Sequence, residues 1–175
     1  MITIITGTNR ENSNSKKVAN TYFDILKNKG LESQVFNLED LHSNFISEDL
    51  YGKRTNQGTE IIKKYIETVN QFIFVIPEYN GSFPGVLKLF IDGIEPAFFN
   101  NKSAILVGVS SGRAGNIVGL NHFTTVLNHV KMEVLSNKIL LSQIESLLGE
   151  NGFIENEISL KLINEQIDLM QKMYL

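Results

Sequence analysis

The segment ITIITGTNRENSNS, residues 2–15, determines how the rest of the chain is interpreted. Its first five residues are apolar or β-branched, which is typical of a short strand buried on both faces. A polar loop follows it. A helical pattern then runs from residue 16 to a capping glycine, with its main positions at Val18, Tyr22, Ile25, Leu26 and Gly30. A strand that passes through a loop into a helix is the repeating unit of a parallel α/β sheet.

The same alternation continues to the end of the chain. Short apolar runs predict further strands at 31–38, 71–76, 102–109 and 132–135. Helical spacing of apolar residues predicts helices at 59–70, 83–94, 116–129 and 155–174. The segment from Leu41 to Gly58 belongs to a polar, irregular stretch, 39–58, which we interpret mainly as loop.

The predicted strands are apolar on both faces, as in parallel sheets that helices cover on both sides. We therefore predict one domain over residues 1–175 with an α/β fold. Its expected form is a three-layer α/β/α arrangement around a five-stranded parallel sheet, in the flavodoxin-like order 2-1-3-4-5.

Composition narrows the class of protein. With a formal net charge of -3, we expect neither nucleic acid nor a membrane surface as a partner. The absence of cysteine excludes disulfides, thiolate metal sites and cysteine nucleophiles. The N-terminus has no basic region of a secretory signal, and the apolar runs are too short to cross a bilayer. We expect a cytoplasmic protein.

In doubly wound sheets, ligands bind beyond the carboxyl ends of the strands. This rule selects the loops after Thr6, Ile76 and Val109, which are also the most unusual stretches of the sequence. Any one of them could be an ordinary connection. Three such loops at one edge predict a ligand site.

The first loop combines Gly7 with hydroxyls and the Arg10 guanidinium, at the start of a helix. Free N–H groups and the helix dipole favour an anion there, and a guanidinium suits phosphate oxygens. The alternative is that Ser13 or Ser15 only caps the helix while Arg10 is solvated. The loop lacks the Gly-Lys-Ser/Thr ending of a Walker loop and the three glycines of a dinucleotide fingerprint. A non-covalent phosphate cradle, as for a mononucleotide, remains.

The other two loops suit a planar ligand. In PEYNGSFPG, residues 77–85, the Asn-Gly pair favours a sharp turn and Tyr79 offers a flat face, as a heteroaromatic ring would require. In SSGRAGNIVG, residues 110–119, glycines allow close approach of the backbone. The alternatives are an ordinary turn and a flexible connector.

The stretch PEYNGSFPGVLKLFIDGIEP, residues 77–96, resembles the signature of the NADPH-dependent FMN reductase family, which includes quinone, azo and chromate reductases. The first loop is similar to that family's G-S-x-R-x-x-S-x-N pattern, and GVSSGRAGN to its serine- and glycine-rich loop. Ser15 replaces the usual asparagine and Thr8 the usual serine, and both keep hydrogen-bonding groups. The resemblance assigns no role to the segment from Leu41 to Gly58.

This resemblance implies FMN as cofactor, with NADPH or NADH as hydride donor. It implies that the FMN phosphate is held by the first loop, through Thr8, Arg10, Ser13, Asn14 and Ser15. It places the isoalloxazine ring against Pro77, Glu78, Tyr79, Asn80, Gly81 and Ser82. It brings the third loop to the ring through Ser110, Ser111 and Gly112.

The implied activity is a ping-pong transfer of a hydride from NADPH to the flavin and then to a small acceptor: a quinone, azo compound, metal oxyanion or free flavin. The flavin N5 carries this chemistry, so no catalytic side chain is expected. A homodimer or a dimer of dimers is also implied. His122 and His129 stand seven residues apart, too far for a helical zinc pair, so we expect surface or interface histidines and no metal site.

Two other functions share this type of sheet. A flavodoxin-type electron carrier would bind FMN without turnover of a pyridine nucleotide, but such carriers are usually more acidic and lack the PEYNG signature. A phosphoacceptor receiver domain needs acidic residues after the first strand and an aspartate at the end of the third. Thr6-Gly7 and Pro77-Glu78 occupy those places, which excludes the receiver.

Overall fold

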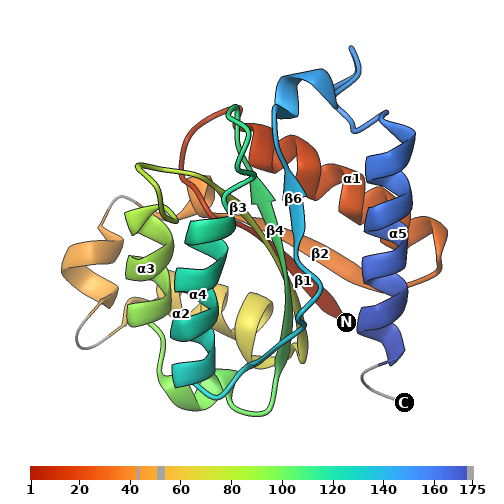
Figure 1. Ribbon diagram of the computed structural model, residues 1–175. Helices are drawn as coiled ribbons and strands as arrows, with labels where there is room; N and C mark the ends of the chain where they lie inside the picture. Colours follow the sequence, from red (N-terminus) through yellow and green to blue (C-terminus); the bar gives the residue numbers. More distant parts are fainter. Residues whose placement is uncertain (43, 51–53, 173–175) are drawn as a thin grey trace.

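A parallel sheet forms the centre of the computed structural model, which describes residues 1–42, 44–50 and 54–172 (Figure 1). Its strands are β1 (Ile2–Thr6), β2 (Ser33–Asn37), β3 (Gln71–Pro77), β4 (Ser103–Val109) and β5 (Glu133–Val134). They lie in the order β2-β1-β3-β4-β5, and the pairs are parallel. The predicted α/β fold and strand order are confirmed.

The fifth position of the sheet is divided between two short strands. β5 pairs only with the start of β4, at Ser103 and Ala104. A further strand, β6 (Ile139–Leu141), pairs with the end of β4. The sequence predicted only the first piece, because three residues that alternate buried, exposed, buried are too few to show a period.

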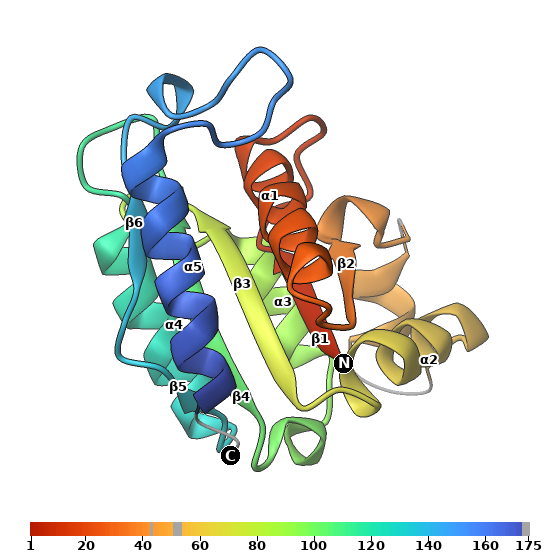
Figure 2. The ribbon, with the colours of Figure 1, turned by 90° about the vertical axis from the view of Figure 1, so that its right-hand side faces the viewer.

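Helices cover both faces of the sheet (Figures 1 and 2). One face carries α1 (Asn14–Asn28) and α5 (Glu157–Lys172), and the other carries α2 (Asn56–Ile62), α3 (Gly85–Asp92) and α4 (Ile117–His129). Each face has its own apolar core. Tyr22 and Ile163 belong to the first core, and Phe74 and Phe123 to the second. Within the described ranges, no helix is both long and apolar enough to cross a membrane.

The stretch 39–58 is more helical than the sequence predicted. It holds most of a 3-10 turn (Leu38–Asp40), a π-helical turn (Phe45–Asp49) and the start of α2. Thr55 caps α2, since its hydroxyl accepts a hydrogen bond from Gly58 N. Gly58 is the reason why the sequence did not predict the start of this helix, because glycine is unfavourable inside helices. Its lack of a side chain is required, because a Cβ there would lie 2.6 Å from the Asp49 carboxylate. Residues 43 and 51–53 of the stretch lie outside the described residues.

The remaining short elements are π-helical Lys63–Glu67 and the 3-10 turns Pro96–Phe99 and Ile144–Ser146. α5 starts two residues after its predicted start, and residues 173–175 are not described.

The loops that follow β1, β3 and β4 emerge together at one edge of the sheet, the upper edge in Figure 1. Backbone hydrogen bonds continue the strand pairing into them. Gly7 N donates to Val75 O at 2.8 Å, Glu78 N to Val109 O at 2.9 Å and Ser110 N to Leu141 O at 3.0 Å. The sheet therefore fixes the start of each loop relative to its neighbour.

Candidate functional site

A cavity of about 520 Å³ opens at this edge, between the three loops. Nine of the residues predicted for a cofactor site line it: Arg10, Ser13, Asn14, Ser15, Pro77, Glu78, Tyr79, Ser110 and Ser111. Thr8 lies buried and bonded to Tyr79. Outside the lining are Asn80, Gly81, Ser82 and Gly112. The topology thus brings together most of the predicted site from three loops. The first and second loops are about 70 residues apart in the sequence, and the second and third about 30.

The two serines at the start of α1 have different roles. Ser13 has extended backbone angles and its hydroxyl accepts from Lys16 N at 3.2 Å, so it is the N-cap. Ser15 is 1% exposed, lines the cavity, and its hydroxyl has no hydrogen-bond partner among the described residues. A buried hydroxyl at a helix N-terminus that bonds nothing in the protein fits an anionic ligand such as phosphate. The capping alternative is correct for Ser13 only.

Arg10 is exposed at the rim of the cavity. Its backbone N–H donates to the Thr8 hydroxyl, which also shares a hydrogen bond of 2.8 Å with the Tyr79 hydroxyl. Thr8 therefore joins the first loop to the second. Its hydroxyl has two partners within the protein, Arg10 N and the Tyr79 hydroxyl.

The second loop folds into a tight two-residue turn. Tyr79 and Ser82 exchange backbone hydrogen bonds of 2.9 and 3.1 Å. Asn80 has φ 52° and Gly81 has φ 76°, the left-handed values of a type I′ turn. The peptide groups of Asn80 and Gly81, both exposed, lie outside the hydrogen bonds of the turn. They can serve a planar ligand with carbonyl and nitrogen acceptors.

The third loop is braced by Ser110. Its hydroxyl donates to Gly112 O at 2.9 Å and accepts from Gly115 N at 3.0 Å. Gly115 has φ 58°, and a Cβ there would lie 2.6 Å from Leu140 Cβ, so this position requires glycine. These contacts give the loop a defined conformation, unlike that of the flexible connector considered as the alternative.

Sequence reasoning missed the fourth wall of the cavity, which Ile144 and Glu145 form just after β6. The Glu145 carboxylate accepts from Ser111 Oγ at 2.8 Å and from Asn14 Nδ2 at 3.1 Å. Its own backbone N–H and the Ser111 hydroxyl are the main reasons why the pKa of Glu145 is lowered. Glu145 therefore stays ionised and ties the first loop to the third. No local pattern in the sequence marks this contact.

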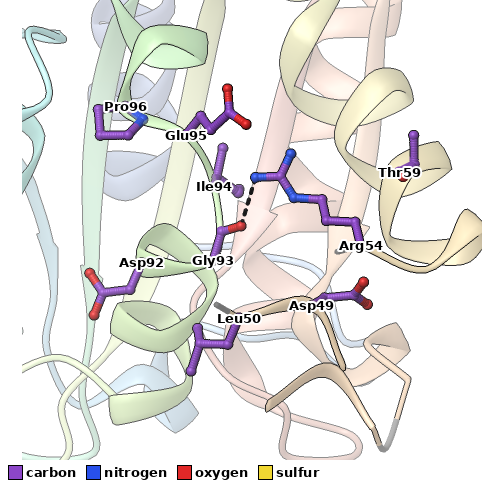
Figure 3. Close-up of a pocket in the computed structure, with 9 residues that line it drawn as sticks. All are labelled: Asp49, Leu50, Arg54, Thr59, Asp92, Gly93, Ile94, Glu95 and Pro96. Atoms are coloured by element: carbon purple, nitrogen blue, oxygen red, sulfur yellow. Dashed lines mark hydrogen bonds between the residues drawn. The ribbon is translucent and has the colours of Figure 1, made fainter. Parts of the chain in front are cut away.

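A larger cavity of about 740 Å³ lies between α2 and the C-terminal end of α3 (Figure 3). The Arg54 guanidinium reaches across it and donates to Gly93 O at 2.9 Å. Asp49, Asp92 and Glu95 also line it, and Asp49 is engaged by Thr55. The smaller cavity is the candidate site, because the larger one contains none of the predicted residues and three of its side chains are acidic. Among the described residues, no group of three or more histidine, aspartate or glutamate side chains could hold a metal.

The chain is similar to proteins of known function. Residues 1–146 match the family described as NADPH-dependent FMN reductase. An NAD(P)H-dependent FMN reductase of Pseudomonas aeruginosa is 27% identical over 131 residues, which are 71% of this chain and 70% of that protein. A 2-hydroxy-1,4-benzoquinone reductase of a Burkholderia species is 26% identical over 111 residues, 61% of each protein and thus less than two thirds of that relative.

A solved structure shares the fold. A flavoenzyme NAD(P)H:acceptor oxidoreductase from Paracoccus denitrificans superposes with a TM-score of 0.79 at 21% identity, over 97% of this chain and 93% of that one. The family match includes all three loops and both residues of the fourth wall. The chain therefore belongs to the NADPH-dependent FMN reductase family and is an oxidoreductase that uses FMN and NAD(P)H.

Proposed function

We propose that this chain reduces a small organic or inorganic acceptor at the expense of NAD(P)H, with FMN held in the 520 Å³ cavity. Two features together carry the proposal: the unsatisfied Ser15 hydroxyl in the cavity wall, and the exposed Asn80–Gly81 turn that follows Tyr79, a residue of another wall. The first suits a phosphate, and the second suits the polar edge of a ring. FMN carries both groups on one molecule.

In this proposal the protein binds and orients the cofactor. Ser15, the free N–H groups at the start of α1 and the Arg10 guanidinium hold the phosphate. Asn14 and Ser111, both bonded to Glu145, form the wall beside it. The Tyr79–Ser82 turn presents backbone N–H groups to the ring, and such donors stabilise negative charge as it develops.

FMN, when bound, supplies the redox chemistry, taking two electrons as a hydride from NAD(P)H and giving them to the acceptor in a ping-pong cycle. The protein needs no general base or nucleophile of its own for this. We propose quinones as the first acceptor class to test, with azo compounds, metal oxyanions and free flavin as the other members. The Burkholderia relative is named for a quinone substrate.

We propose a homodimer or a dimer of dimers in the cytoplasm as the working form. An apolar groove of about 460 Å³ between α3 and α4 supports self-association, and its walls include Ile91, Ile94, Val126 and Val130. The absence of cysteine fits a reducing compartment.

The test is an anaerobic titration of the FMN-loaded protein with NADPH, and then with NADH, followed by the flavin absorption band. The proposal predicts stoichiometric bleaching that a quinone reverses. Bound flavin that neither nucleotide bleaches would instead identify an electron carrier. Protein that cannot be loaded with FMN would refute the proposal.

A further inference from the structure

Three residues of the α4 segment face the turn of the second loop. Asn116, Gly119 and His122 are spaced by three, so they recur on one side of the helix. Each one contacts the stretch from Ile76 to Ser82 through a different part of its structure. The sequence predicted close backbone approach for the glycines of residues 110–119, Gly119 among them, and gave His122 no role in the site.

Asn116 holds the end of β3. It is the buried N-cap of α4, with φ 64°, and its side-chain amide donates to Ile76 O at 3.1 Å and to Pro77 O at 3.0 Å. Gly119 lets the turn approach the helix. A Cβ there would lie 2.7 Å from the backbone carbon of Ser82 and 2.1 Å from Asn116 Oδ1. The backbone of the turn therefore packs directly on α4.

His122 also bonds the turn. The imidazole Nδ1 lies 2.9 Å from Ser82 Oγ, a hydrogen bond between residues 40 positions apart. His129 stands seven residues later on the same helix and is also exposed. Within the described part of the chain, the His129 side chain forms no hydrogen bond or ion pair. Of these two histidines, His122 is the one that bonds the second loop.

We propose that His122 is a positioning residue for the cofactor, an inference that rests on the proposed FMN site. The hydrogen bond between Ser82 Oγ and His122 Nδ1 fixes the Ser82 side chain relative to α4, whichever of the two atoms donates. This bond also pins the last residue of the Tyr79–Ser82 turn against α4. The exposed N–H groups of Asn80 and Gly81 are thereby held in one orientation before the ring arrives, which lowers the ordering cost of binding.

The test compares three variants with the wild type. His122→Leu removes the hydrogen bond, His122→Asn keeps a polar atom near the position of Nδ1, and His129→Leu is the matched control. The first readout is amide hydrogen exchange at Tyr79 and Ser82 in protein without added FMN, because these two N–H groups close the turn. We expect about three- to tenfold faster exchange in His122→Leu, and wild-type exchange in the other two.

The second readout is the FMN dissociation constant, with the visible absorption and circular dichroism of the bound flavin. We expect about three- to tenfold weaker binding and shifted flavin bands in His122→Leu, and values within about twofold of wild type in His122→Asn and His129→Leu. In a Ser82→Ala background, His122→Leu should have no further effect, because the shared bond is already gone.

Equal behaviour of His122→Leu and His129→Leu in both readouts would overturn the inference, as would full additivity with Ser82→Ala. Faster exchange without a change in FMN affinity would also overturn it, since His122 would then stabilise the turn only. Failure of the wild type to bind FMN would refute the proposed function and the cofactor role of His122 together, and the exchange data would still show whether His122 holds the turn.

Discussion

The hydroxyls of Thr8 and Tyr79 lie 2.8 Å apart and connect the first loop of the site to the second. The residues are 71 positions apart, and Thr8 is almost fully buried. Tyr79 lines the candidate FMN cavity, and Thr8 bonds it from outside the lining. The cavity therefore keeps its shape through protein contacts, in addition to any contact with a ligand.

Tyr79→Phe removes that bond and leaves the ring in place. We expect unfolding free energy to fall by about 0.5–1.5 kcal/mol, the net value of a typical hydrogen bond. FMN binding should weaken in parallel, because the two loops are no longer joined. Urea unfolding and FMN fluorescence titration measure the two effects. Thr8→Val should lower both at least as much, because it also removes the acceptor of the Arg10 N–H, and Thr8→Ser should lower neither. Identical results for Val and Ser would contradict this account.

Ser13→Ala and Ser15→Ala should separate capping from ligand binding. Ser13→Ala removes the N-cap and should lower the unfolding free energy by about 0.5–2 kcal/mol. Ser15→Ala removes a hydroxyl with no partner among the described residues, so the unfolding free energy should change by less than about 0.5 kcal/mol. FMN affinity should instead drop at least about tenfold in Ser15→Ala, since a bond to a charged phosphate is lost.

The same unfolding and titration experiments decide this second prediction. If Ser15→Ala binds FMN as tightly as the wild type, the Ser15 hydroxyl does not contact the phosphate.

Tyr22→Phe tests a buried network on the face of the sheet that α1 and α5 cover. The Tyr22 hydroxyl donates to Gln166 Oε1 at 2.7 Å, and Gln166 Nε2 donates to Leu106 O and Asn137 O. The variant leaves a buried acceptor unsatisfied, so unfolding free energy should fall by about 1–3 kcal/mol at neutral pH. Tyr65→Phe is the control, since its hydroxyl makes no hydrogen bond within the described ranges.

The Tyr22 network also has a pH dependence. Burial raises the pKa of Tyr22 well above its usual 10.0, so the folded state holds this proton more strongly than the unfolded state. The protonated Tyr22 hydroxyl makes its full contribution to the unfolding free energy below about pH 10. This contribution is lost as the pH rises toward the folded-state pKa of Tyr22. The stability difference between wild type and Tyr22→Phe should therefore shrink in alkaline urea titrations. A difference that is constant with pH would contradict this.

Glu145→Gln should have the opposite pH dependence. The pKa of Glu145 is lowered from 4.5, so its hydrogen bonds contribute stability above about pH 4.5, and this is lost as pH falls through the folded-state pKa. Acid urea titrations should show the wild-type advantage over Glu145→Gln shrinking over that window. Glu150→Gln, at an exposed glutamate nearby, should show no such convergence. If both variants behave alike, the tie from Glu145 to Asn14 and Ser111 is absent in solution.

The sequence was sufficient for the strand order and for three walls of the cavity, because both follow from local patterns. Buried β-branched runs mark the strands, and the carboxyl-edge rule places Arg10, Tyr79 and Ser110 together. The choice between Ser13 and Ser15 as helix cap could not be made, because both offer a hydroxyl and only backbone angles distinguish them. The fourth wall, Ile144 and Glu145, could not be predicted, because the strand that precedes it, β6, is only three residues long and shows no pattern.

Contacts between distant side chains were also unpredictable. The bonds of Glu145 to Asn14 and of His122 to Ser82 span 131 and 40 residues. They depend on how helices and loops sit on the sheet, which local spacing does not encode. Most of the residues that hold the candidate site in shape belong to this group.

The most direct test of the central claim is the affinity of the protein for FMN against riboflavin, which differ only in the phosphate. Isothermal titration calorimetry on flavin-free protein gives both dissociation constants. Charge-assisted hydrogen bonds from Ser15 and the start of α1 predict that FMN binds at least about 100-fold more tightly than riboflavin. Equal affinity for the two would show that the first loop does not cradle a phosphate.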